Sequence, residues 1–167
     1  MSSTEFAAWV QIIAAELREG RRQIVEVARA VPVDRWDRAS SVDGWTYKDI
    51  LSHLAAGDIF CQAVVSAVIG GGPVDLREFG SAREERTANI LRQRRQRPIS
   101  ELLDEVKSEG LRTEALISRL TDEDEAVSVT ISNSTGAATT LGAYLRAFPD
   151  HDKEHIAQLR TIAEVAA

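Results

Sequence analysis

This chain of 167 residues has one cysteine, no excess of basic residues and no long apolar run. Each of these features excludes some classes of protein. The single cysteine, Cys61, leaves no intrachain disulfide, which favours the reducing cytoplasm over a disulfide-stabilised secreted scaffold. The net charge of −6 argues against a nucleic-acid partner, because affinity for phosphates comes mainly from basic side chains. The longest apolar-leaning run, 59–69, is too short to cross a bilayer, and the N-terminus does not resemble a signal peptide. We therefore expect a cytoplasmic protein without a membrane or nucleic-acid partner.

Aromatic residues are also few, at 5%, whereas the good helix formers Ala, Leu, Arg and Glu are plentiful. This bias favours an all-α fold, and the length suits one domain over residues 1–167. Apolar residues at helical spacing predict four long helices, which is typical of a four-helix bundle. The helices are expected at 3–30, 46–69, 98–121 and from 139 almost to the C-terminus. The polar pattern of residues 81–96 predicts a short exposed helix or else a long connector. The small and hydroxylated residues at 126–138 predict a loop or a stray strand.

Specific residues mark where these helices begin and bend. Ser2 with Glu5, and Thr46 with Asp49, have the spacing of capping boxes at the first two helix starts. Pro149 lies inside the last predicted helix, where the missing N–H group is expected to cause a kink.

The chain has three histidines, and their positions are related. His151 and His155 are four residues apart and share the apolar face of the last helix. His53 lies in the second helix among Ile50, Leu51 and Leu54. Burying three imidazoles without partners would cost about 1–3 kcal/mol each. A divalent zinc, nickel or iron ion would satisfy all three and keep an open coordination position, whereas the alternative is ordinary hydrogen-bonded core histidines.

Residues 151–155 also match the H-x-x-E-H pattern of inverted zinc proteases, in which the glutamate is the general base. Twelve residues follow His155, which is too little chain for the downstream ligand and cleft of such a protease. Glu154 remains the candidate proton-transfer residue, although its position about 100° around the helix from His155 favours a place in solvent.

Two segments resemble a known superfamily. Residues 44–54, GWTYKDILSHL, resemble the start of the second helix in the DinB/YfiT-like superfamily. Residues 148–159, FPDHDKEHIAQL, resemble its last-helix motif H-x-x-x-H-x-x-Q-(L/I). The resemblance covers nearly the whole chain and is specific at these two motifs. It implies a four-helix bundle with one metal on His53, His151 and His155, and frequent homodimers. The superfamily includes bacillithiol S-transferases and the metal-binding part of mycothiol-dependent maleylpyruvate isomerase.

Helix two departs from many relatives at Gly57, where they carry a large residue. We expect the glycine to allow close helix packing, although it could instead open space beside the metal. Cys61 lies two turns from His53, about 12 Å along the helix, which is too far for a fourth ligand. We therefore interpret it as a core residue.

An arginine-rich stretch spans residues 83–97. Because Arg forks onto carboxylates and phosphates, Arg92 is a candidate contact for an anionic thiol cofactor. An asparagine of this region faces the site in some relatives, which makes Asn89 a second candidate. The pattern more simply favours a solvated surface helix.

Three functions follow from a three-histidine metal site with a small-molecule substrate. A thiol S-transferase or isomerase would use the metal to lower the pKa of a low-molecular-weight thiol, so that thiolate attacks an electrophile. A hydrolase would lower the pKa of water in the same way. A non-catalytic module would bind or sequester a small molecule, with a structural metal. The resemblance favours the thiol-dependent enzyme.

Overall fold

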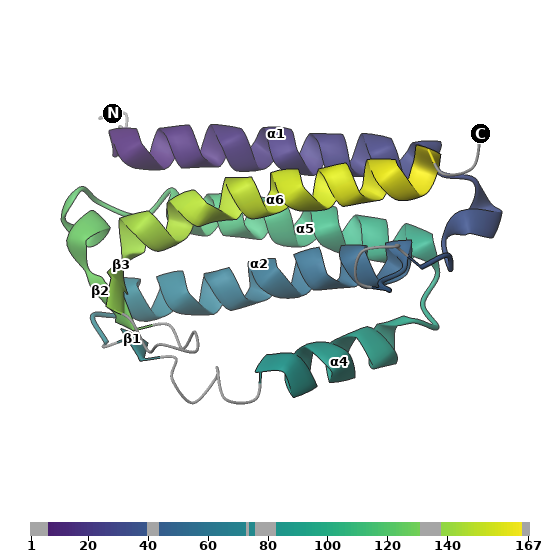
Figure 1. Cartoon of the computed structure of the whole chain (residues 1–167). Coiled ribbons are helices and arrows are strands. Elements are labelled where there is room, and N and C mark those ends of the chain that lie inside the picture. Colours follow the sequence, from purple (N-terminus) through teal and green to yellow (C-terminus); the bar gives the residue numbers. More distant parts are fainter. Residues whose placement is uncertain (1–6, 40–43, 73, 76–82, 131–137, 165–167) are drawn as a thin grey trace.

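Four long helices lie side by side in the computed structural model, which describes residues 7–39, 44–72, 74–75, 83–130 and 138–164 (Figure 1). They are α1 (Ala8–Ala30), α2 (Tyr47–Ile69), α5 (Ile99–Ile117) and α6 (Leu141–Glu164). The shorter α4 (Arg83–Arg94) runs along the outer side of α2 (Figure 1). The predicted all-α four-helix bundle is therefore confirmed, with a helix rather than a bare connector between its second and third long helices.

The helices pack in a ring. Helix α1 packs mainly on α6 and α5, and α2 packs mainly on α5 while also contacting α6 and α4. The two helices that carry the histidines, α2 and α6, are therefore neighbours around the ring. Helix α2 is long and apolar enough to meet a compositional test for a membrane span. The buried residues on its inner faces, which pack into the bundle core, account for that composition.

The predicted cap of α2 is present. Thr46 Oγ1 accepts a hydrogen bond from the Asp49 backbone N–H at 3.2 Å, and Asp49 Oδ2 accepts one from the Thr46 N–H at 3.0 Å. Helix α1 begins at Ala8 rather than at residue 3, because Ala7 has a non-helical backbone. The capping box expected at residues 2–5 lies outside the described residues. Helix α5 ends at Ile117, before the predicted residue 121, and α6 continues through Pro149.

A small sheet closes one end of the bundle (Figure 1). Its order is β1 (Val74–Asp75), β2 (Ser128–Thr130) and β3 (Ala138–Thr140), with a parallel β1–β2 pair and an antiparallel β2–β3 pair. Val74 pairs with Val129, and both side chains are buried in the core. The sequence predicted at most a stray strand here, because the partner of Val129 lies more than fifty residues away. Short 3₁₀ helices at Val33–Arg35 and Glu123–Ala126 complete the described elements.

The apolar core has two halves, one toward the sheet and one toward the opposite end. Cys61 is fully buried in the sheet-side half, as expected of a core residue, and burial raises the pKa of its thiol. The expectation of close packing at Gly57 is wrong, because a Cβ atom at this position would meet no atom beyond its chain neighbours and the adjacent backbone of α2 within 4 Å. Arg21, Asp58 and Asp152 are buried, and along their helices they lie between the stretches that form the two core halves.

Candidate metal centre

The three histidines come together between α2 and α6. His53 on α2 and His151 on α6 place their Nε2 atoms 3.0 Å apart, and the Nε2 atoms of His151 and His155 are 3.2 Å apart. One ligand nitrogen from each ring lies within 4.8 Å of the other two, and all three side chains are half-buried. A tetrahedral ion with metal–nitrogen distances of about 2.0–2.1 Å holds its donor atoms roughly 3.3 Å apart. The donor spacing therefore fits one bound ion.

Hydrogen bonding alone satisfies this cluster poorly. In a neutral imidazole each nitrogen carries either one proton or one lone pair, so it is a single donor or a single acceptor. His151 Nε2 faces both of the other Nε2 atoms at hydrogen-bond distance and cannot form a good bond to each. A metal ion removes the conflict, because it accepts one lone pair from each ring. The donor set therefore fits a divalent ion such as zinc, nickel or iron.

Gln158 orients one of the three ligands. His155 Nδ1–H donates to Gln158 Oε1 at 2.9 Å, one turn further along α6. This bond keeps the proton on Nδ1 and leaves the Nε2 lone pair directed at the cluster. Metal-bound histidines commonly have such an outer partner, which fixes the tautomer and the ring orientation.

Trp45 covers one side of the cluster. Its ring meets His53 edge-on with centroids 4.8 Å apart, and it lies parallel to His155 at 6.2 Å. The tryptophan directly precedes the capping residue Thr46, so the cap that begins α2 also places the indole.

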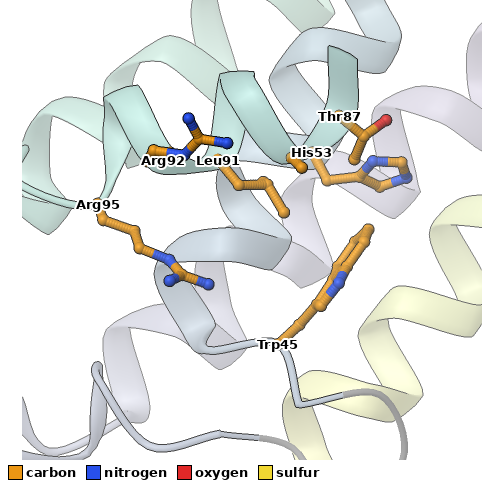
Figure 2. Close-up of a pocket in the computed structure, with 7 residues that line it drawn as sticks. Trp45, His53, Thr87, Leu91, Arg92 and Arg95 are labelled. Carbon is orange, nitrogen blue, oxygen red and sulfur yellow. The ribbon is translucent and has the colours of Figure 1, made fainter. Parts of the chain in front are cut away.

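A cavity of about 640 Å³ opens beside His53, between α2 and α4 (Figure 2). Leu91 and Thr87 extend from α4 toward Trp45 and His53 (Figure 2). The remaining lining residues are Ala88, Arg92 and Arg95. The cluster therefore borders a space large enough for a small molecule.

Most of the described arginines at the end of the arginine-rich stretch are used within the protein. Arg94 donates to the Ser52 carbonyl at 2.9 Å and pairs with Glu105 at 2.6 Å. Arg95 Nε and Nη2 lie 3.0 and 3.1 Å from the two carboxylate oxygens of Asp49. Burial opposes ionisation of Asp49, but the bonds from Arg95 and Thr46 together lower the pKa of that carboxyl. These contacts fasten α4 to the start of α2.

The other predicted site residues occupy different positions. Arg92 lines the cavity with an exposed side chain. Asn89 is half-buried on α4 but is not among the residues that line the cavity. Glu154 is exposed on α6 and is not part of the histidine cluster. Their functional roles stay predictions.

A second polar cluster lies next to the first and was not predicted. Arg21 Nη2 lies 2.8 Å from Asp58 Oδ2, and Arg21 Nη1 lies 2.9 Å from Asp152 Oδ1. Thr113 Oγ1 donates to Asp58 Oδ1 at 3.1 Å, and all of these side chains are buried. Burial raises the pKa of Asp58, and it raises the pKa of Asp152 to about 6, although Arg21 opposes both shifts. Gly20 leaves room for Asp152, because a Cβ there would lie 3.0 Å from its Oδ2 atom.

Comparison with known proteins places the chain in a family. The sequence model of the mycothiol maleylpyruvate isomerase N-terminal domain matches residues 17–148, well over half of the chain. The chain belongs to this family. The matched range includes His53 and ends before His151 and His155, so the geometry rather than the match assigns the last two histidines.

A solved structure shares the fold of this family member. It is YfiT from Bacillus subtilis, described as a probable metal-dependent hydrolase with an unusual four-helix bundle topology. The TM-score is 0.69 at 18% identity, over 99% of this chain and 89% of the other. This likeness confirms the expected DinB/YfiT-like fold and, at that identity, the fold alone. No curated protein matches the chain.

No role was predicted from the sequence for Gln158 or Trp45, although each lies in one of the two family motifs. None was predicted for the ionic cluster of Arg21, Asp58 and Asp152 either. The spacing of Gln158, three residues after His155, was the available signal for a contact on one helix face. Nothing in the sequence paired Arg21 with Asp58 and Asp152, because the three residues come from three helices.

Proposed function

We propose that this protein is a divalent-metal-dependent enzyme that activates a small thiol for transfer to a small electrophile, or for isomerisation of one. The observation that carries the proposal is the convergence of three half-buried histidine nitrogens beside an open cavity. When bound, the ion would supply Lewis acidity, which lowers the pKa of a thiol or a water molecule at its remaining position.

The protein's own residues would perform the supporting tasks. His53, His151 and His155 would hold the ion, and Gln158 would keep the His155 ring in the required tautomer. Trp45 and Leu91 would give the adjacent cavity an apolar wall against which a small substrate packs.

A thiol would need less help than water to become the nucleophile at this site. In the part of the chain that the structure describes, the metal-ligating cluster contains histidines only. Glu154, the sequence candidate for proton transfer, is exposed. Generating a nucleophile from water usually needs a positioned proton acceptor, whereas a thiol ionises much more readily. The name of the family, which refers to mycothiol, supports the same preference.

A metal-dependent hydrolase is the second candidate. It is favoured by the likeness to YfiT, which is described as a probable enzyme of that kind. The lone, buried Cys61 supports a cytoplasmic location for either enzyme.

One experiment separates the two candidates. Metal-free protein is loaded with zinc or nickel and given low-molecular-weight thiols with a chromogenic aryl halide, and in parallel a chromogenic ester. We expect metal-dependent conjugation of the thiol that is lost in the His155→Ala variant. Metal-dependent ester cleavage without conjugation would support the hydrolase instead. Metal binding with neither activity would leave the non-catalytic binding module as the better account.

A further inference from the structure

The cavity beside His53 has two unlike walls. Trp45 and Leu91 form an apolar and aromatic wall next to the histidine cluster (Figure 2). Arg92 and Arg95 line the cavity as well, and none of the described residues that line it is acidic. A ligand that fills this space next to the metal would therefore meet both an apolar surface and positive charge.

The two arginines are not equivalent. Arg95 directs Nε and Nη2 at the buried carboxylate of Asp49, so its charge is largely offset. Arg92 forms no ion pair or side-chain hydrogen bond with any residue that the structure describes, in contrast to its helix neighbours Arg94 and Arg95. Its guanidinium is therefore the lining cation with its full hydrogen-bonding capacity still available.

We propose that this cavity is a binding subsite for a small amphipathic anion, with its carboxylate or phosphate on Arg92 and its apolar part against Trp45 and Leu91. The proposal rests on the proposed metal-dependent function and names the class of ligand that the site selects. Arg presents paired N–H donors that match the oxygens of a carboxylate or phosphate, and such charge-assisted bonds are stronger than bonds between neutral groups. The apolar wall adds affinity without regard to charge.

The test compares an anion with its neutral isostere. Zinc-loaded protein is titrated by calorimetry with 4-phenylbutyrate and with 4-phenylbutyramide, and both titrations are repeated on metal-free protein. We expect the carboxylate to bind about tenfold or more tightly than the amide. Arg92→Gln is expected to remove this preference while leaving the affinity for the amide unchanged. Leu91→Ala is expected to weaken both probes.

Arg119→Gln is the matched control, because Arg119 is exposed after α5 and does not line the cavity. It should leave both affinities unchanged. A carboxylate that bound the metal directly would bind no more tightly than the amide in metal-free protein, and its affinity would not change in Arg92→Gln. That pattern would overturn the proposal. Failure of the carboxylate to bind at millimolar concentration would overturn it too.

The outcome separates this inference from the proposed function. Elemental analysis of the same samples reports the metal content independently of ligand binding. Metal retained without any preference for the anion contradicts the subsite alone. An anion preference that depends on Arg92, in a protein that binds no metal, supports the subsite and contradicts the metal-dependent function.

Discussion

Two polar clusters lie close together in this bundle, and both join α2 to α6. One is ionic and consists of Arg21, Asp58 and Asp152. The other consists of His53, His151 and His155. In the ionic cluster the partners carry opposite charges, so the protein itself supplies most of the compensation. In the histidine cluster three similar groups face one another, and an added cation is the partner that suits them all.

The contrast teaches how to tell a structural polar cluster from a ligand site. The ionic cluster is closed, since its side chains are at most about 10% exposed and Thr113 occupies a further carboxylate oxygen. The histidine cluster is half-buried and borders a cavity. Buried charges that are already paired hold helices together, whereas converging donors at a cavity wall are available to bind a ligand.

The largest expected effect is on the ionic cluster. Arg21→Met leaves two carboxylates buried without their cation, and we expect the free energy of unfolding to fall by about 3–5 kcal/mol. Urea denaturation measures this loss. Arg18→Met, which removes an exposed arginine from the same helix, should cost little. A similarly small loss for Arg21→Met would show that the ionic cluster does not hold the bundle together.

The next effect concerns the histidine cluster. Gln158→Leu removes the acceptor of His155 Nδ1–H, and we expect metal affinity to fall about 10–100-fold. Competition with a chromogenic chelator gives the affinity. Gln158→Glu keeps an acceptor at this position and should retain metal binding. Equal metal affinities for the two variants would show that the hydrogen bond from His155 does not contribute to the site.

The ionic cluster should also respond to pH in a defined direction. Burial raises the pKa of Asp58 above its ordinary value near 3.8, so the folded protein takes up a proton at a higher pH than the unfolded chain. The wild-type free energy of unfolding should therefore rise, relative to that of Asp58→Asn, as pH falls through the raised pKa toward 4. Urea titrations of both proteins across this range test the sign. A fall in the relative stability of the wild type would show that the ionised form is the one the fold favours.

The smallest expected effect lies between the two clusters, at Gly57. Because a Cβ there would meet no side chain or neighbouring element within 4 Å, Gly57→Ala should gain roughly 0.5–1 kcal/mol of stability from its better helix propensity. Metal affinity should not change. Thermal unfolding measures the gain. A loss of stability would instead support the close helix packing that was expected from the sequence.

Local patterns predicted the elements whose causes are local. The Thr46–Asp49 cap, the end of α2 and the existence of α4 all follow from neighbouring residues. The sheet did not, because β1 and β2 pair across a long stretch of chain. The start of α1 was wrong by several residues, since helix propensity alone does not show where the first tertiary contacts begin.

The candidate site divides in the same way. His151 and His155 could be placed together from their spacing, and the apolar neighbours of His53 indicated that it too faced the core. The family motif then supported all three as ligands of one metal. The contact of Trp45 with the cluster depends on how the residues before α2 approach α6, which no spacing encodes. The pairing of Arg21 with two carboxylates likewise depends on the packing of three helices.

The metal content of the protein tests the central claim most directly. The wild type and His151→Ala are purified without a nickel column and compared by elemental analysis, with zinc titration of each. The account predicts about one divalent ion per wild-type chain and its loss from the variant, because His151 Nε2 faces both other ligands. Wild-type protein that contains no metal and takes up none on titration would contradict the claim, and so would undiminished binding by His151→Ala.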